Sequence, residues 1–537
     1  MNELCDRAGD RRPSRVEIAA LMGICLTSVL VRCLDLSRGL WLDELHTSWV
    51  VTDSFYQVSP RAISGNQSPV YFYGVWLISF FLGQSEITLR LISVTAGFSL
   101  SFFAWWLTRK ITSSRAPALL AAALIASDPF LIEYSQEARP YALLQLLGLF
   151  QIYYFAERMH QVFEIGQSNI QPKSKSRRIG FILSAIASFY IHFTAMLLTL
   201  SMLGIAVGWS VFGLRKFSHQ QFKLLLDFMA IFLACLPLLG IVLLISERRS
   251  NWELFVNDSS YRDSIFFQCW AYVVPGCFAI LVSLLTRGAK NTARKSIVYA
   301  CCFFLPIILS WISFKLGLAA LYHPRYSLIG WSGAVLFYCT EIGIISISPK
   351  QSIRKFAFWI CVPALGFALS HNHLLWHVVY QKQLTMPFES PWRESVDYLE
   401  TFQNKQTVFL FPNLIEDQLL TGPVHLSPQK RQTLENYCSF PLKGIYQVST
   451  ANIVPRSSLF RPRFHSTDKK TLLDSGRVVL IIRGNKEVQS DILNEFASFG
   501  LEMKIFIRKI SEKEFPVRGA PGNFISVWKF EVKAEPL

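Results

Sequence analysis

The sequence predicts a polytopic α-helical membrane protein with a soluble α/β domain at its C-terminus. Of its 537 residues, 51% are hydrophobic and only 17% are charged, whereas about a quarter of the residues in a soluble domain are charged. Apolar runs of about 20 residues, long enough to cross a bilayer, recur up to residue 377. Beyond residue 380 charged residues return and the apolar runs are too short to span. We therefore predict a membrane domain over 1–379 and a soluble domain over 380–537.

About eleven segments are predicted to cross the membrane, the first as an uncleaved span because no small-residue cleavage site follows it. They are 17–34, 87–107, 116–132, 140–156, 179–192, 194–213, 224–245, 265–285, 297–318, 327–346 and 356–377. The apolar segment 68–83 lies in the first outer loop, 35–86, and is short for a span. It is rich in Tyr, Trp and Phe, which favour membrane interfaces. We predict an interfacial or re-entrant helix there.

The distribution of basic residues predicts the topology. The formal net charge is +16, and Lys and Arg gather in alternate loops, such as 109–115, 173–178 and 287–295. Loops of this kind face the cytoplasm, which places the first loop and the C-terminal domain outside an inner (plasma) membrane. Because topology accounts for the excess charge, nucleic acid is not a predicted partner.

Four strands and two helices are predicted in the C-terminal domain. The helices are 390–403 and 488–500, the second closed by Gly500, and the strands are 406–412, 476–484, 502–510 and 524–532. This alternation is typical of an α/β sandwich. The domain has neither a GxGxxG motif nor a phosphate loop, so no nucleotide site is predicted.

The stretch "GLWLDELHTSWVV", 39–51, carries the first candidate site residues, Asp43, Glu44 and His46. A carboxylate at the membrane surface can act as general base towards an acceptor hydroxyl. The two acids can instead be a solvated pair in the first turn of a helix. The apolar flanks favour a groove over a merely solvated loop.

A second group of candidates lies at the outer ends of later spans. Glu137 and Arg139 occur in "IEYSQEARPYALL", where Glu133 and Glu137 would share a face if helical. His192 lies in a tight hairpin, "FYIHFTA". Arg325 and Tyr326 follow His323 in "HPRY". Arginine suits phosphate binding because its guanidinium group is always charged and can donate two parallel hydrogen bonds to phosphate oxygens. An Arg–Glu pair, a structural His and a snorkelling Arg are the respective alternatives.

The histidines of "HNHLLWH" give the one indication of a metal. His373 and His377 stand four residues apart, a spacing that can bind a metal ion, although an interfacial belt beside Trp376 is the alternative. The sequence has no CxxC motif and no zinc-ligand spacing. No cofactor is required by this interpretation, and a divalent metal is left open.

Taken together, these motifs resemble the GT-C membrane glycosyltransferases, in the bacterial branch related to protein O-mannosyltransferases and the lipid A aminoarabinose transferase. The resemblance rests on "LWLDELHT", on "NQSPVYFYGVWLISFFLGQSEITLRLISVTAG", and on "QEARPYALL", "FYIHFTA" and "HPRY" in this order. One departure is Gln67-Ser68, where relatives usually have His-Pro.

The resemblance implies an inverting transfer of a hexose or pentose from a polyprenyl-phosphate donor to a lipid, glycan or protein acceptor on the outer face. It assigns the base to Asp43, with Glu44 as its partner, and the lipid phosphate to Arg139, His192, Arg325 and Tyr326. Glu137, Tyr141 and His46 are further candidates for substrate binding. A transporter or lipid flippase, and a polymerase of envelope polysaccharide, are the rival functions.

Overall fold

The structure is a computed structural model. It describes residues 13–163, 174–212, 219–247, 277, 280, 290–318, 321–346, 389–402, 406–420, 427–448, 451–520 and 522–534. Two compact units are formed. The first, here the helical unit, comprises Met1–Leu36, Asn66–Tyr71 and Arg90–Thr385. The second, here the loop–sheet unit, comprises Ser37–Gly65, Phe72–Leu89 and Met386–Leu537. The sequence predicts a boundary between residues 379 and 380. The loop–sheet unit contains the C-terminal residues from Met386 onwards and also much of the first loop.

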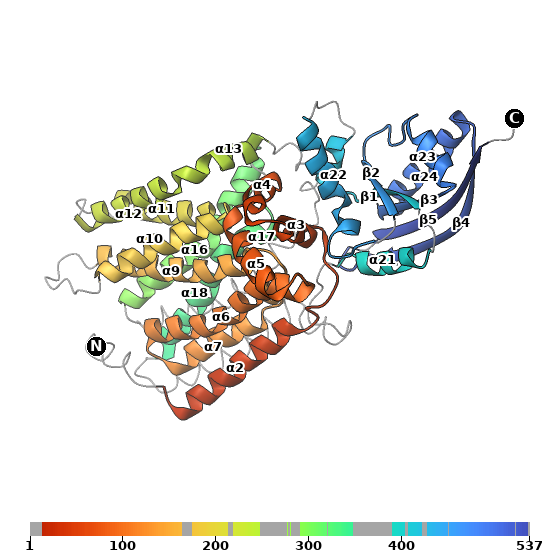
Figure 1. Cartoon of the computed structure of the whole chain (residues 1–537). Coiled ribbons are helices and arrows are strands. Elements are labelled where there is room, and N and C mark those ends of the chain that lie inside the picture. Colours follow the sequence, from red (N-terminus) through yellow and green to blue (C-terminus); the bar gives the residue numbers. More distant parts are fainter. Residues whose placement is uncertain are drawn as a thin grey trace. The chain divides into compact units, whose positions relative to one another are not determined.

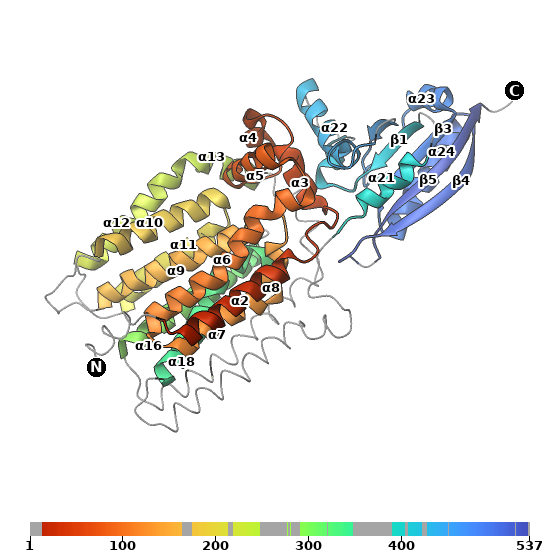
Figure 2. The same ribbon diagram turned by 60° about the horizontal axis from the view of Figure 1, so that its bottom comes forward.

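The helical unit is a bundle of helices that run side by side (Figures 1 and 2). Its helices are α2 (Arg15–Cys33), most of α6 (Glu86–Thr112), α7 (Arg115–Ser127), α8 (Pro129–Ser135), α9 (Tyr141–Phe163), α10 (Ser174–Ile191), α11 (Ala195–Phe212), α12 (His219–Cys235), η1 (Leu236–Leu238), α13 (Leu239–Glu247), α16 (Lys290–Lys315), α17 (Pro324–Ser327), η2 (Leu328–Gly330) and α18 (Trp331–Ser346). Within the described residues, five helices are long and apolar enough to cross a membrane, or six if the bent pair α7–α8 is one span.

Most predicted spans within the described residues fall on one helix, whereas 116–132 covers α7 and part of α8, and 224–245 covers parts of α12 and α13 with η1 between them. The polytopic helical class is confirmed. Of the predicted spans 265–285 and 356–377, the structure describes only residues 277 and 280, so the number eleven stays a prediction. The bend of 59° between α7 and α8 has a local cause. Asp128 at this junction accepts hydrogen bonds from the amides of Phe130 and Leu131 at 2.9 and 3.1 Å. It therefore caps α8 and starts a new helix direction.

Buried acidic residues are paired with basic ones near the C-terminal end of α9. Arg158 donates to Asp227 of α12 at 2.8 and 3.1 Å, and Arg178 also pairs with Asp227. The neighbouring Glu157 pairs with Arg177 and Lys295. A rise of 1.5 Å per residue places Glu157 about 24 Å along α9 from Tyr141, its first residue. The helical unit thus has a layer of ion pairs at one end of this helix.

The loop–sheet unit contains a five-stranded mixed sheet of order β2-β1-β3-β5-β4. Its strands are β1 (Gln406–Phe411), β2 (Ala451–Pro455), β3 (Arg477–Gly484), β4 (Ile505–Pro516) and β5 (Phe524–Ala534). Strands β2, β1 and β3 are parallel, and β5 pairs antiparallel with both β3 and β4. The helices of the unit are α3 (Leu42–Val51), α4 (Phe55–Ser64), most of α5 (Pro69–Leu82), α21 (Trp392–Glu400), α22 (Pro428–Lys443), α23 (Asp468–Ser475) and α24 (Lys486–Glu502), with η3 (Ile415–Leu420).

Alternate residues of the strands form a hydrophobic core with α23 and α24. Phe409 of β1 and Leu480 of β3 lie in one buried cluster with Phe496 of α24. Both β1 and the centre of β3 are buried on both faces, which explains their continuous apolar sequences. Helix α24 runs through Gly500 and ends at Glu502, so the prediction that Gly500 closes it is wrong. A Cβ at Gly500 would lie 2.5 Å from Ile507 Cδ1, and glycine is needed there for close packing on β4.

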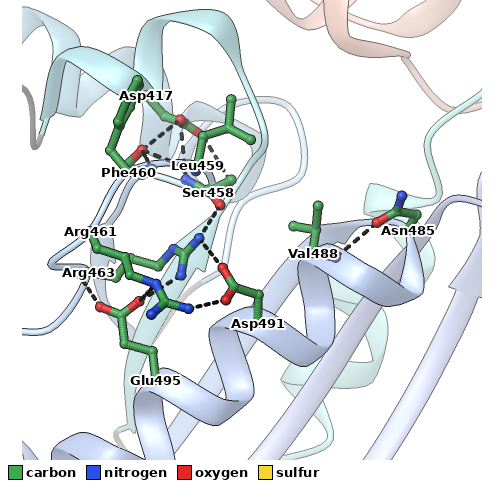
Figure 3. Close-up of polar contacts among 11 residues, drawn as sticks. Asp417, Ser458, Leu459, Phe460, Arg461, Arg463, Asn485, Val488, Asp491 and Glu495 are labelled. Atoms are coloured by element: carbon green, nitrogen blue, oxygen red, sulfur yellow. Dashed lines mark hydrogen bonds and ion pairs between the residues drawn. The ribbon is translucent and has the colours of Figure 1, made fainter.

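An arginine cluster fastens the segment after β2 to α24 (Figure 3). Arg463 is 2% exposed and donates to Glu495 at 2.6 Å and to Asp491 at 2.7 Å. It also donates to the carbonyl of Ser458 at 2.9 Å. The hydroxyl of Ser458 in turn donates to Asp417 at 2.9 Å. These bonds satisfy a guanidinium that would otherwise be buried at high cost.

Candidate functional site

The two candidate acids, Asp43 and Glu44, lie in the first turn of α3. Glu44 is buried and its Oε2 accepts the Trp41 amide at 3.4 Å, so it caps the helix that it belongs to. Asp43 is partly exposed. The helix N-terminus favours negative charge at both positions. Glu44 therefore has a structural task, while Asp43 is the acid that a solute can reach.

His46 is held in a set of aromatic rings. Its imidazole lies 6.0 Å from the Trp49 ring, 5.9 Å from Phe72 and 5.7 Å from Tyr437, measured between ring centroids. A Cβ at Gly65 would lie 1.9 Å from His46 Nε2, so only glycine fits there. His46 is 4% exposed, and its packing helps to fix α3, while its part in substrate binding stays a prediction.

The second group of candidates comes together in the helical unit, around the turn between α10 and α11. His192 lies in this turn, 5.4 Å from the Tyr141 ring and 6.1 Å from the Tyr326 ring. Its Nδ1 accepts the Thr194 amide at 3.3 Å and lies 2.7 Å from the Thr194 hydroxyl. Because Nδ1 accepts, the proton of the neutral ring is assigned to Nε2. That atom makes no hydrogen bond with any residue that the structure describes.

The charge state of His192 follows from its surroundings. Burial and the positive charges of Arg139 and Arg325 lower the pKa of His192 to about 3. The imidazole is therefore neutral at physiological pH, and its Nε2–H is a neutral donor beside two cations. The sequence analysis did not identify Thr194, which bonds to His192 Nδ1 and so orients the ring. A separation of two residues is one at which a side chain can bond to a nearby backbone group.

Arg325 and Tyr326 belong to the short helix α17. His323 caps this helix, since its Nδ1 accepts the Arg325 amide at 3.3 Å. The Arg325 Nε also lies 3.2 Å from the same Nδ1. Burial and the charge of Arg325 lower the pKa of His323 to about 2. His323 is thus a neutral acceptor that orients Arg325, and the Tyr326 ring lies 5.7 Å from it.

Arg139 and Glu137 lie in the turn between α8 and α9, and Tyr141 begins α9. Helix α8 ends at Ser135, so Glu137 does not share a helical face with Glu133. Arg139 is 4% exposed and its carbonyl accepts the Ser93 hydroxyl at 2.8 Å. The Tyr141 hydroxyl has no hydrogen-bond partner among the described residues. Two neutral donors, from His192 and Tyr141, and two guanidinium groups, from Arg139 and Arg325, thus gather in one unit.

Six of the nine predicted site residues therefore lie in the helical unit, and three lie in the loop–sheet unit. The cationic cluster, as we name it, consists of Glu137, Arg139, Tyr141, His192, Arg325 and Tyr326 in the helical unit. The other three, Asp43, Glu44 and His46, share α3 in the loop–sheet unit. Among the described residues no group of three His, Cys, Asp or Glu side chains could hold a metal ion. The histidines at 373 and 377 lie outside the described residues.

Comparison with solved structures identifies the fold. The chain resembles ArnT from Cupriavidus metallidurans in the apo state, with a TM-score of 0.51 and 8% identity over 95% of this chain and 97% of that one. The same protein bound to undecaprenyl phosphate gives a TM-score of 0.50 with the same identity and coverage. An apo oligosaccharyltransferase from Archaeoglobus fulgidus gives 0.48 at 9% identity, over 92% of this chain and 69% of that one.

No protein-family model matches the chain, and no curated protein matches it either. The similarity to ArnT extends over nearly the full length of both chains, including the helical bundle and the C-terminal sheet. It shows that the chain shares the fold of ArnT, as the sequence resemblance predicted.

Proposed function

We propose that this protein is an integral-membrane, inverting glycosyltransferase that takes its sugar from a polyprenyl-phosphate donor. The observation that carries the proposal is the cationic cluster, in which the neutral Nε2–H of His192 lies beside the positive charges of Arg139 and Arg325. A phosphate monoanion or dianion needs this combination of neutral donors and fixed positive charge. The Tyr141 hydroxyl adds another donor.

Asp43 is the general base in this proposal. An acceptor hydroxyl attacks the anomeric carbon of the donor and gives its proton to the Asp43 carboxylate. The bond between the anomeric carbon and the phosphate oxygen breaks at the same time, which inverts the anomeric configuration. Asp43 suits this task better than Glu44 because Glu44 is buried and accepts the Trp41 amide. Glu44 instead keeps the first turn of α3 in place.

The leaving group needs no protonated acid. A polyprenyl phosphate is stable as an anion at neutral pH, so the enzyme has only to stabilise the charge that it gains. Arg139 and Arg325 supply that stabilisation, in the manner of the fixed donors that stabilise other developing anions. Two opposed carboxylates, as in glycoside hydrolysis, are not required.

The ends of the helices support an outer site in a multi-pass protein of about eleven spans. The ion pairs of Asp227 and Glu157 lie near the basic loops that the topology places in the cytoplasm. The cationic cluster lies at the opposite end of α9. The distance along the helix from Tyr141 to Glu157 is about 24 Å, which is comparable with the hydrocarbon thickness of about 30 Å. Helix α5 has only 14 residues, and its Phe80 and Phe81 are exposed. These features suit a helix at the outer interface and an extracytoplasmic C-terminal domain.

The comparison with ArnT supports the donor class. One of the two similar ArnT structures is bound to undecaprenyl phosphate, a polyprenyl phosphate of the kind that the cationic cluster suits. The acceptor is a hydroxyl group of a cell-envelope lipid, glycan or protein.

The rival function as a transporter is not favoured by the buried charges. A transporter uses ionisable residues near the membrane midplane to bind and release its substrate. Asp227 is fully buried and ion-paired with two arginines. The Ser296 hydroxyl bonds to Glu341. Both acids therefore already have partners that stabilise the bundle.

The test combines genetics with a single substitution. A strain lacking the protein should lose one envelope sugar and accumulate the matching polyprenyl-phosphate sugar. Wild type should restore the sugar, whereas Asp43→Asn should insert into the membrane normally and restore nothing. Glu44→Gln serves as the matched control and should retain measurable transfer if the protein is folded. Full complementation by Asp43→Asn would contradict the assignment of the base, and accumulation of an unlinked polymer would favour the polymerase.

A further inference from the structure

The segment that leads into α3 is held by the C-terminal part of the chain. Arg393 donates to the Ser37 carbonyl at 3.0 Å. The Gly39 amide donates to Glu389 Oε1 at 2.8 Å, and the Leu40 amide donates to the Tyr446 hydroxyl oxygen at 2.8 Å. These bonds lie immediately before Leu42, where the helix begins.

Packing continues these contacts along the helix. The Tyr437 ring of α22 lies 4.7 Å from the Trp49 ring and 5.7 Å from the His46 ring. Leu40 and Val50 are fully buried, and Trp49 is 3% exposed. A Cβ at Gly39 would approach the Ser390 carbonyl to 3.1 Å. Hydrogen bonds before the helix and aromatic packing along it thus fix both the position and the rotation of α3.

A charge from the sheet also acts on the acidic end of α3. Arg483, the penultimate residue of β3, donates to the Asn413 carbonyl at 3.3 Å. Burial lowers the pKa of Arg483 to about 10, and the negative charges of Asp43 and Asp417 oppose that shift. The guanidinium is therefore cationic at neutral pH and close enough to Asp43 for the two charges to interact.

We infer that the C-terminal domain is a positioning element for the first-loop acid, acting through Tyr446, Glu389 and Tyr437 on α3. The inference rests on the proposed function in one respect, namely that Asp43 is the base. A general base must lie within hydrogen-bond reach of the proton that it takes. A displacement of 1 Å at a reacting group can lower a rate about 100-fold. Without the hydrogen bonds to Tyr446 and Glu389, we expect the first loop, 35–86, to let Asp43 move by more than about 1 Å.

Tyr446→Phe in the full-length protein tests the inference, because it removes one hydroxyl and leaves the ring. Hydrogen exchange should become faster at residues 37–49 and stay unchanged in β1 and β3. Transfer should fall about tenfold or more in kcat, with KM for the polyprenyl-phosphate sugar unchanged. Tyr398→Phe is the matched control, because Tyr398 bonds to Ser511 at 3.5 Å and should leave both readouts unchanged.

A second pair of variants distinguishes positioning from a general loss of structure. Glu389→Gln keeps an oxygen acceptor for the Gly39 amide and should retain most of the transfer, whereas Glu389→Ala should behave like Tyr446→Phe. Unchanged exchange at 37–49, or unchanged kcat per folded molecule in Tyr446→Phe, would overturn the inference. Absence of transfer by wild type from any polyprenyl-phosphate sugar tested would instead overturn the proposed function. The hydrogen-exchange experiment would still show whether Tyr446 and Glu389 hold residues 37–49 in place.

Discussion

The amide of Leu40 donates a hydrogen bond to the hydroxyl oxygen of Tyr446 across 406 residues of sequence. Leu40 lies two residues before α3, and Tyr446 lies three residues after α22. Both residues are buried, with Leu40 at 0% and Tyr446 at 6% exposure. An amide left unpaired in such a place costs about 1–3 kcal/mol. The start of α3, the helix that carries Asp43 and Glu44, therefore depends on Tyr446 in the C-terminal domain.

Substitutions at His192 should separate its role as a donor from its role in packing. His192→Gln retains an N–H near the position of Nε2, whereas His192→Phe removes it. We expect His192→Phe to weaken binding of undecaprenyl phosphate about tenfold, the equivalent of one hydrogen bond of about 1.4 kcal/mol. His192→Gln should weaken it less. The measurement is a titration of purified protein with the lipid, and equal affinity of all three proteins would refute the role of Nε2–H.

Gly65→Ala should disturb α3 through His46. The added Cβ would lie 1.9 Å from His46 Nε2, and the aromatic rings around that imidazole leave it little room to move. Overpacking of this kind costs about 1–3 kcal/mol, so we expect a lower unfolding temperature together with reduced transfer. Gly23→Ala in α2 is the control, since no atom lies within 4 Å of a Cβ there. Equal unfolding temperatures for both variants and wild type would contradict the close packing.

Arg463→Ala should destabilise the C-terminal domain strongly. Arg463 is buried and bonds to Glu495, Asp491 and the Ser458 carbonyl, and removal of one partner from such a network costs about 3 kcal/mol or more. Arg461→Ala is the matched control, because Arg461 pairs with the same two acids while its side chain is 61% exposed. An exposed pair contributes less than about 1 kcal/mol. Thermal unfolding of both variants checks the difference, and similar losses would show that burial is not decisive here.

The stability of the C-terminal domain should fall as pH rises towards neutrality because of Asp417. Burial raises the pKa of Asp417 to about 7, despite hydrogen bonds from Ser458, Leu414 and Ser457. In the unfolded chain the pKa is about 3.9. Between these values the folded state holds the extra proton, so stability is greatest below pH 4 and is lost as pH rises through 7. The shift corresponds to about 4 kcal/mol.

Asp417→Asn supplies the comparison for this pH dependence. The amide side chain does not ionise, so the unfolding temperature of this variant should change less than that of wild type between pH 5 and pH 8. A wild-type domain that becomes more stable over this interval would show that the hydrogen bonds to the carboxylate outweigh its burial.

Hydropathy and chain order predicted much of this fold, because both act locally. Each apolar run of about 20 residues can satisfy its own backbone only as a helix, and β1 and β3 are continuous apolar stretches. Four elements of the C-terminal domain were missed, one of them the six-residue helix η3. Strand β2 has five residues and ends in Pro455, α22 contains Pro441, and α23 has only eight residues. Strand β2 and helix α23 are too short to be identified from sequence, and α22 has 16 residues but is interrupted by Pro441.

The candidate site was predicted in its residue types and only partly in its arrangement. Ionisable residues such as His and Arg at the outer ends of spans are costly near a membrane, and that argument found His192, Arg139 and Arg325. It could not find the contact of Tyr437 with Trp49, because no local pattern encodes the pairing of α22 with α3. The roles of Asp43 and of the cationic cluster stay predictions until the substitutions above are made.

The separation of Leu40 from Tyr446 also has a consequence for biosynthesis. A ribosome adds about 5–20 residues per second, so the first loop is made about 20–80 s before its hydrogen-bond partner exists. During that interval Leu40 lacks its hydrogen bond to Tyr446, and Trp49 lacks its contact with Tyr437. The nascent protein can insert its helices in order, but α3 reaches its final place only after the last domain has folded. A chain truncated before the C-terminal domain would therefore remain in the membrane, but α3 would lack its contacts with Tyr446 and Tyr437.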